Sequence, residues 1–202
     1  MLVSAIMPTR GRPQFAQRAL ECFLSQTWPE KELAILDDAD NPSFPDGIAG
    51  EGIYYERLKR RLSIGAKRNL CCSRASGDVL MHWDDDDWSS PERMADQVER
   101  LSQANCGLTG YHSMIFEDRD TGKRWKYTGP LHGADALGTS LCYTRRFWMA
   151  HPFPDRQVGE DGAVTGRVSG ILSVDAGDLL IATIHPGNTS PKTMGRRWAL
   201  LD

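Results

Sequence analysis

The segment VLMHWDDDDWSSPERM, residues 79–94, is the most informative part of the sequence, because an apolar run ends in four consecutive aspartates and a helix-forming sequence follows. The apolar run, residues 79–83, predicts a buried strand, and the later part predicts a helix with Ser90 as its N-cap and Pro91 in its first turn. Aspartates 84–87 therefore stand at the carboxyl end of a strand, where ligands bind in open α/β sheets. Adjacent like charges repel one another, so this segment calls for a neutralising cation.

The residues before this segment alternate between strand and helix patterns. Residues 2–7 predict a buried strand that stops at Pro8, residues 13–27 predict a helix, and residues 31–40 predict a second strand that ends in acids. A further helix is expected from about residue 65 to residue 75. This alternation is typical of an α/β sheet.

The pattern becomes less regular after residue 105. Residues 106–118 and 123–129 predict a β-hairpin, and residues 138–153 predict a strand that runs into a short helix. The sequence shows no internal repeat and no interdomain linker. We therefore expect a single domain over residues 1–202.

Composition narrows the class of protein. The 202 residues are 40% hydrophobic, enough for one buried core, and the net charge of −3 gives no overall basic signal for nucleic-acid binding. The first apolar run is too short for a signal peptide, and no segment approaches the roughly 18 apolar residues of a membrane helix, so we expect a soluble cytoplasmic protein. Five cysteines without a CxxC pair predict reduced, mostly buried thiols.

Three features of the sequence are candidates for metal-binding or catalytic residues. Carboxylates such as Asp84–Asp87 bind Mg²⁺ or Mn²⁺ together with the oxygens of a substrate phosphate, although a solvated acidic turn is the alternative. Glu160 and Asp161 open a predicted helix, where acids also simply favour the helix N-terminus. His185 follows an apolar strand and is either a metal ligand or a packing residue.

The order of these features resembles that of the family-two glycosyltransferases. The similarity covers VSAIMPTRGRPQFAQRALECFLSQTWPEKELAILDDAD, then GAKRNLCCSRASGDVLMHWDDDDW and GTSLCYTRRFWMAHPFP, and finally GEDGAV and HPGNTS. This resemblance implies the GT-A fold, a Rossmann-like mixed sheet flanked by helices. It also implies a nucleotide-sugar-binding half, residues 1–104, and a smaller acceptor-side half, residues 105–202.

The implied activity is metal-dependent inverting transfer of one sugar from a nucleoside diphosphate sugar to a hydroxyl acceptor. UDP is the favoured donor nucleotide, and the divalent cofactor is Mn²⁺ or Mg²⁺. A metal suits this chemistry because it stabilises charge on the departing diphosphate, and a carboxylate suits it because the attacking hydroxyl must lose a proton.

The resemblance also assigns residues to roles. Asp161 is expected to be the general base, with Glu160 beside it. Asp86 is expected to be the direct metal ligand, with Asp84 facing the nucleotide sugar and His185 as a second protein ligand. The donor is expected to contact a larger set of residues, namely Pro8, Thr9, Arg10, Asp37, Asp38, Lys67, Arg68, Asn69, Asp84 and Asp85.

The acceptor stays open at this point and includes glycans, lipids, small molecules and a hydroxylated base in DNA. Basic residues in ERLKRRLSIGAKR and SPKTMGRRWALLD would suit an anionic acceptor, or they form solvated faces or contacts to the diphosphate. The alternative functions are a nucleotidyltransferase or pyrophosphorylase and a catalytically inactive nucleotide-sugar-binding module. Because the chain ends soon after His185, we expect a small enzyme that adds one sugar; its oligomeric state is open.

Overall fold

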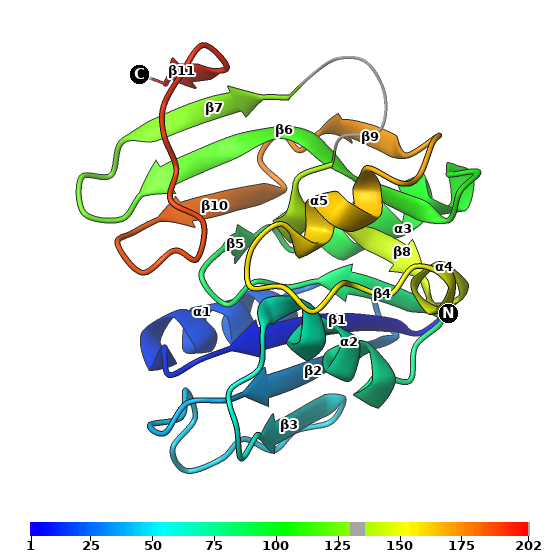
Figure 1. Cartoon of the computed structure of the whole chain (residues 1–202), viewed down its shortest axis with the longest axis vertical. Helices are drawn as coiled ribbons and strands as arrows, with labels where there is room; N and C mark the ends of the chain where they lie inside the picture. The colour runs from blue at the N-terminus through cyan, green and yellow to red at the C-terminus, as the bar shows by residue number, and fades with distance from the viewer. Residues whose placement is uncertain (130–135, 202) are drawn as a thin grey trace.

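Four parallel strands form the first half of the sheet in this computed structural model, which describes residues 1–129 and 136–201. Their order is β3-β2-β1-β4, and all of their carboxyl ends lie at one edge (Figure 1). The strands are β1 (Val3–Thr9), β2 (Lys31–Asp37), β3 (Ile53–Arg57) and β4 (Val79–His82).

The second half of the chain extends the same sheet with mostly antiparallel pairs. β8 joins β4 to β6, and β6 forms the predicted hairpin with β7, which then pairs with β11. β9 and β10 run parallel to β6, and β10 also pairs with β5. The elements are β5 (Trp88–Ser89), β6 (Leu108–Asp118), β7 (Arg124–Thr128), β8 (Cys142–Thr144), β9 (Leu172–Asp175), β10 (Leu180–Ile184) and β11 (Trp198–Leu200).

Helices cover both faces of this sheet. The side chains of β1 alternate, so that Val3, Ala5 and Met7 pack against one helical layer while Ile6 packs against the other. The first layer holds α1 (Pro13–Leu24) and α3 (Arg93–Gln103), and the second holds α2 (Ile64–Arg74), α4 (Arg145–Ala150) and α5 (Glu160–Thr165). The predicted α/β mixed sheet flanked by helices is confirmed.

A third apolar cluster lies between β6, β10 and the C-terminal segment. Phe116 packs against Tyr127 and Trp198, with ring centroids 6.2 and 4.7 Å away. This cluster holds the chain after β10, drawn in red in Figure 1, against the second half of the sheet.

Two local predictions are wrong. Strand β1 continues through Pro8 to Thr9. Because β4 pairs with β1 only as far as Ile6, the missing N–H of Pro8 costs the sheet no hydrogen bond. Helix α3 begins at Arg93, because Ser90 starts a preceding turn in which its hydroxyl accepts from the Glu92 amide.

Other local features agree with the sequence or add to it. Buried free thiols are confirmed for Cys22, Cys71, Cys72 and Cys142, whereas Cys106 is partly buried. Strand β3 lies in the segment that the sequence analysis left between predicted elements. Among the described residues, no helix combines the length and apolar character needed to cross a bilayer.

Arg93 ties α3 to the sheet from inside the core. It is 1% exposed, and its guanidinium donates to the carbonyl oxygens of His82 and Thr139 at 2.8 and 2.9 Å and to Ser89 Oγ at 2.9 Å. The guanidinium carbon also lies 5.0 Å from the centroid of the Trp83 ring. The arginine therefore joins the end of β4 to the first helical layer and to the segment around residue 139.

We predict that Arg93→Met lowers the free energy of unfolding by about 3 kcal/mol, because two buried carbonyl groups lose their donor. Urea denaturation followed by circular dichroism measures this change. Arg100→Met is the matched control, since Arg100 lies on the same helix and makes a partly exposed pair with Asp96. The control change should stay below about 1 kcal/mol. Equal effects of both substitutions would contradict a central role for Arg93.

Candidate active site

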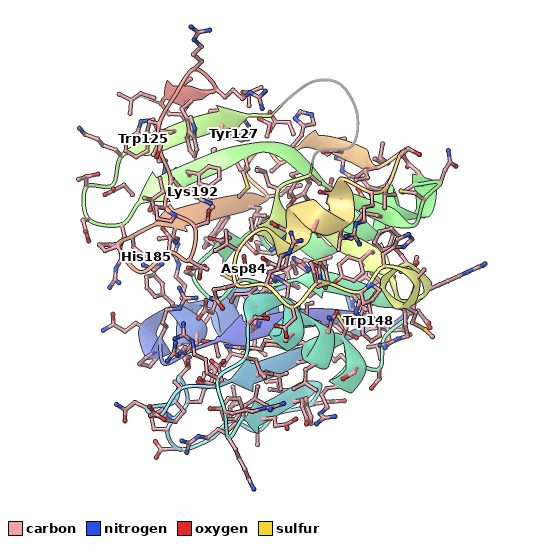
Figure 2. The ribbon with its side chains drawn as sticks, in the orientation of Figure 1. Asp84, Trp125, Tyr127, Trp148, His185 and Lys192 are labelled. Carbon is pink, nitrogen blue, oxygen red and sulfur yellow. The ribbon has the colours of Figure 1, made fainter. Side chains whose placement is uncertain are left out.

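A cavity of about 320 Å³ opens at the carboxyl ends of β1 and β4. Aspartates 84–87 line one side, and Glu160 and Asp161 approach from α5. Asn188 and Lys192 belong to the lining contributed by the C-terminal segment. Figure 2 shows Asp84 near the centre of the molecule, with His185 and Lys192 toward the C-terminal segment. The structure thus brings together acids that the sequence separates by more than seventy positions.

Arg68 connects the two acidic sides of this cavity. From α2, its Nη2 donates to Asp84 Oδ1 at 3.0 Å and its Nε donates to Glu160 Oε1 at 3.2 Å. Burial disfavours the charged form of Asp84, but Arg68 and other positive groups outweigh burial, so the pKa of Asp84 lies below its usual value. Burial raises the pKa of Glu160, with Arg68 acting against it. Arg68 therefore keeps Asp84 charged and holds Glu160 in place.

Arg12 is the cation that meets Asp85 and Asp86. Its Nε lies 3.0 Å from Asp85 Oδ2, and its Nη1 lies 2.8 Å from Asp86 Oδ2. Asp85 is 1% exposed and also accepts from Thr9 Oγ1 at 2.6 Å. Burial raises the pKa of Asp85 to about 7, against the opposing effect of Arg12. Thr9 and Asp85, which were both predicted to contact the sugar donor, are thus hydrogen-bonded to each other inside the protein.

Asp87 supports the cavity wall from within. Thr139 Oγ1 donates to its Oδ2, and the Thr183 amide donates to its Oδ1 at 3.0 Å. Burial and the neighbouring carboxylates Asp86 and Asp84 raise the pKa of Asp87 well above its usual value. Asp87 thereby ties β10 to the segment around residue 139.

His185 meets Asp86 where the chain leaves β10. Its Nε2 lies 3.0 Å from Asp86 Oδ2, and its ring stacks on Phe15 with centroids 4.5 Å apart. The Gly187 amide donates to His185 Nδ1 at 3.1 Å, so Nε2 carries the proton that is shared with Asp86. The predicted pair of metal ligands is therefore in contact, with a proton between the two side chains.

Asp86 and His185 offer two ligands that suit a divalent cation, whose remaining ligands would come from a substrate. Carboxylate oxygen and imidazole nitrogen are both donors that divalent cations accept, and here they lie side by side. Within residues 1–129 and 136–201, no group of three or more His, Cys, Asp or Glu side chains is arranged to hold a metal. A cation at this place would need oxygens from a ligand such as a diphosphate. The neutral His185 ring would also have to carry its proton on Nδ1, which would give up the hydrogen bond from the Gly187 amide.

Asp161 differs from Glu160 in being partly exposed to the cavity. Its Oδ1 accepts from the Gly162 amide at 2.7 Å, and its Oδ2 packs against Gly138. A Cβ built on Gly138 would lie 1.5 Å from Asp161 Oδ2, so only glycine leaves room for the carboxylate in this position. Asp161 is thus a cavity carboxylate without a bound arginine among the described ion pairs.

Four of the residues assigned to the donor are engaged inside the protein. The Asp37 carboxylate accepts from the amides of the loop after β2, and Asp38 forms a buried ion pair with Lys67. Lys67 also donates to the Thr9 carbonyl at 2.9 Å. Asn69 bonds to Phe153 and to the Trp148 ring nitrogen. These contacts brace the loops around the cavity, whereas Pro8 lines the cavity itself.

Sequence analysis missed the arginine that reaches the aspartates. Arg10 is exposed and is absent from the cavity lining, while Arg12 lies two positions later in the same PTRGRP segment. Gly11 between them has φ of 60°, a turn conformation that glycine adopts without strain. Gly138 and Asn188 were also missed, and the signal for Asn188 was its place in the HPGNTS segment.

Comparison with known proteins places this geometry in a family. The family model described as glycosyl transferase family 2 matches residues 4–171. The chain is 30% identical to a Bacillus subtilis protein named as the glycosyltransferase EpsE, over 70% of this chain and 54% of that protein. It is 26% identical to TuaG of the same organism, named as a teichuronic acid biosynthesis glycosyltransferase, over 71% of this chain and 60% of that protein.

Solved structures with the same fold include S. aureus TarS in complex with UDP-GlcNAc, at a TM-score of 0.70 and 15% identity. That match covers 94% of this chain and 60% of TarS residues 1–349. Mannosyltransferase PcManGT of Pyrobaculum calidifontis, in complex with GDP-Man and Mn²⁺, matches at a TM-score of 0.66 and 13% identity, over 90% of this chain and 56% of that chain.

The chain spans between about half and three fifths of the length of these relatives. The family match nevertheless runs through β1, the four aspartates and α5, which together build the cavity. The chain belongs to glycosyl transferase family 2.

Proposed function

We propose that this protein is a metal-dependent, inverting glycosyltransferase that moves one sugar from a nucleoside diphosphate sugar to a hydroxyl acceptor. The observation that supports the proposal is the cavity, whose lining includes both aspartates 84–86 and Asp161. Transfer with inversion uses two such groups, because the leaving diphosphate and the attacking hydroxyl lie on opposite faces of the sugar carbon.

The donor is a nucleoside diphosphate sugar, with UDP as the favoured nucleotide. TarS has been solved with UDP-GlcNAc and with UDP, and PcManGT with GDP-Man, so UDP and GDP sugars are the first donors to compare. The acceptor is a compound with a free hydroxyl group.

Asp86 and His185 are proposed to hold Mn²⁺ or Mg²⁺, with Asp84 facing the nucleotide sugar. When bound, the metal supplies a Lewis acid that stabilises charge on the departing diphosphate. Arg68 and Lys192 border the same cavity and supply further positive charge near this leaving group. The presence of Mn²⁺ with GDP-Man in PcManGT supports a divalent cofactor.

Asp161 is proposed to be the general base. Its carboxylate is open to the cavity and has no bound arginine among the described ion pairs, so it can accept a proton from an acceptor hydroxyl. Glu160 is held by Arg68 and instead fixes the start of α5. The two adjacent acids therefore have different tasks, positioning for Glu160 and proton transfer for Asp161.

Donor hydrolysis tests the reaction class without knowledge of the acceptor. The purified protein is incubated with MnCl₂ and a panel of UDP and GDP sugars, and the products are identified chromatographically with and without a chelator. Release of UDP or GDP together with free sugar is expected in the presence of metal only. Release of pyrophosphate would instead indicate a nucleotidyltransferase or pyrophosphorylase. Donor binding without turnover would indicate an inactive binding module.

Asp161→Asn should lower the rate of donor hydrolysis by about 10²- to 10⁴-fold, because the amide cannot take the proton from the attacking water, which stands in for the acceptor hydroxyl in this assay. The thermal shift caused by UDP and Mn²⁺ should persist, since the nucleotide side of the cavity is unchanged. Asp120→Asn, an exposed change in the β6–β7 turn, is the control. Undiminished turnover in Asp161→Asn would contradict the assignment of the base.

Asp86→Asn and His185→Ala should each raise the Mn²⁺ concentration needed for half-maximal activity by about 10-fold or more, because each removes one of two protein ligands. Activity measured across a MnCl₂ titration provides the readout. His151→Ala is a matched control, since His151 contacts only α4 in the described structure. An unchanged Mn²⁺ dependence in both site variants would exclude this pair as the metal ligands.

A further inference from the structure

The turn at residues Gly138–Ser140, labelled η1, is held by three buried side chains. Its three successive carbonyl oxygens each accept one side-chain hydrogen bond. His82 Nδ1 lies 2.6 Å from the Gly138 oxygen, Arg93 Nη2 lies 2.9 Å from the Thr139 oxygen, and Gln97 Nε2 lies 2.6 Å from the Ser140 oxygen. The turn is therefore fixed from β4 and from α3, and its backbone has little freedom to shift.

Gly138 presents this fixed backbone to the cavity. The carboxylate of Asp161 occupies the space where a side chain at residue 138 would lie. The other oxygen of the Asp161 carboxylate accepts a hydrogen bond from the Gly162 amide, which also belongs to α5. The position of Asp161 is thus set by α5 on one side and by Gly138 on the other.

His82 holds the Gly138 carbonyl by a hydrogen bond, but its other ring nitrogen is buried without a partner among the described residues. The ring is completely buried and lies beside the rings of Tyr143 and Phe153, with centroids 5.5 and 5.2 Å away. Because Nδ1 donates to a carbonyl oxygen, the bare Nε2 is left as an acceptor, and it has no hydrogen-bond partner among the described residues. A phenylalanine would fill this aromatic pocket without burying an unpaired nitrogen.

Within residues 1–129 and 136–201, the side chain of His82 has one hydrogen bond, the one to the Gly138 carbonyl. Burial lowers the pKa of His82 well below its usual value, with Arg68 acting in the same direction, so the ring is neutral and remains a one-proton donor. The energetic benefit of an imidazole at this place therefore comes from the Gly138 carbonyl.

We infer that His82 is a positioning residue for Asp161, acting through its hydrogen bond to the Gly138 carbonyl. The inference rests on the proposed function, in which Asp161 is the general base. His82 does not itself line the cavity, and the turn is the route by which it reaches Asp161. A displacement of about 1 Å at a reacting group lowers a rate by up to about 10²-fold, which sets the size of effect to look for.

Two substitutions of His82 separate its hydrogen bond from its volume. His82→Phe keeps an aromatic ring but removes the donor, and His82→Asn restores a donor close to the position of Nδ1. The probe is hydrolysis of the UDP or GDP sugar that the full chain accepts, measured as nucleoside diphosphate release. We expect kcat to fall by about 10- to 100-fold in His82→Phe and by no more than about 3-fold in His82→Asn. The donor KM and the Mn²⁺ dependence should stay within about 2-fold in both.

His151→Phe is the matched control. His151 Nδ1 also lies near a carbonyl oxygen, that of Phe147 at 3.1 Å, and its ring also stacks on an aromatic side chain, but it lies away from the cavity. Removing that contact should leave kcat unchanged. A loss of kcat equal to that of His82→Phe would assign the effect to general destabilisation and overturn the inference.

A double-mutant cycle with Asp161→Asn tests the link directly. If His82 acts through Asp161, His82→Phe should change kcat by less than about 2-fold once Asp161 is replaced. Gly138→Ala provides a second route, because its methyl group displaces the same carboxylate while His82 stays intact. It should show the same loss of kcat and the same lack of effect in Asp161→Asn, and it serves if His82→Phe does not fold.

The outcomes distinguish the inference from the function on which it rests. Full activity of Asp161→Asn overturns the proposed base, and with it the positioning role. A large loss in Asp161→Asn, combined with an effect of His82→Phe that is equal in both backgrounds, preserves the base and overturns the role of His82. Failure of His82→Asn to recover activity also contradicts the hydrogen bond as the cause.

Discussion

Neutralisation of the acids at the end of β4 is the constraint on which the rest of the structure depends. Arg12 comes from the start of α1 and Arg68 from α2, so each of the two helical layers contributes one arginine that pairs with these aspartates. Burial and its acidic neighbours raise the pKa of Asp87 well above its usual value. The first two loops and both helices must therefore be correctly placed before this segment can be ordered.

The second half of the chain completes the site as an integral part of the sheet. β10 pairs with both β5 and β6, and the Thr183 amide of β10 donates a hydrogen bond to the Asp87 carboxylate. Arg93 and the turn at 138–140 connect the same region to α3. The residues proposed to bind the donor and the proposed base consequently share one rigid framework.

Hydrophobic periodicity was sufficient to predict the main strands and helices, apart from some of their ends. The resemblance to the family-two glycosyltransferases, and not periodicity, assigned Asp84–Asp87 and Asp161 to one site, and both line the cavity. The sequence was insufficient to choose Arg12 over Arg10, since the choice depends on the turn at Gly11. Short strands such as β5 and β11 depend on distant partners and have almost no local signal. The role of His82 was equally hidden, because a histidine inside a strand pattern does not reveal which carbonyl it will meet.

The wide sequence spacing of the cavity contacts has a consequence for how the protein folds. Arg12 meets Asp85 across 73 positions, and Asp86 meets His185 across 99. Contacts of such high order form late, because a long loop must close before they contribute any stability. A growing chain that has completed only β1 to β4 therefore carries the aspartates without the histidine or the carboxylate of α5. The cavity is therefore complete only when the whole sheet has formed, and a folding intermediate that lacks the last strands does not contain it.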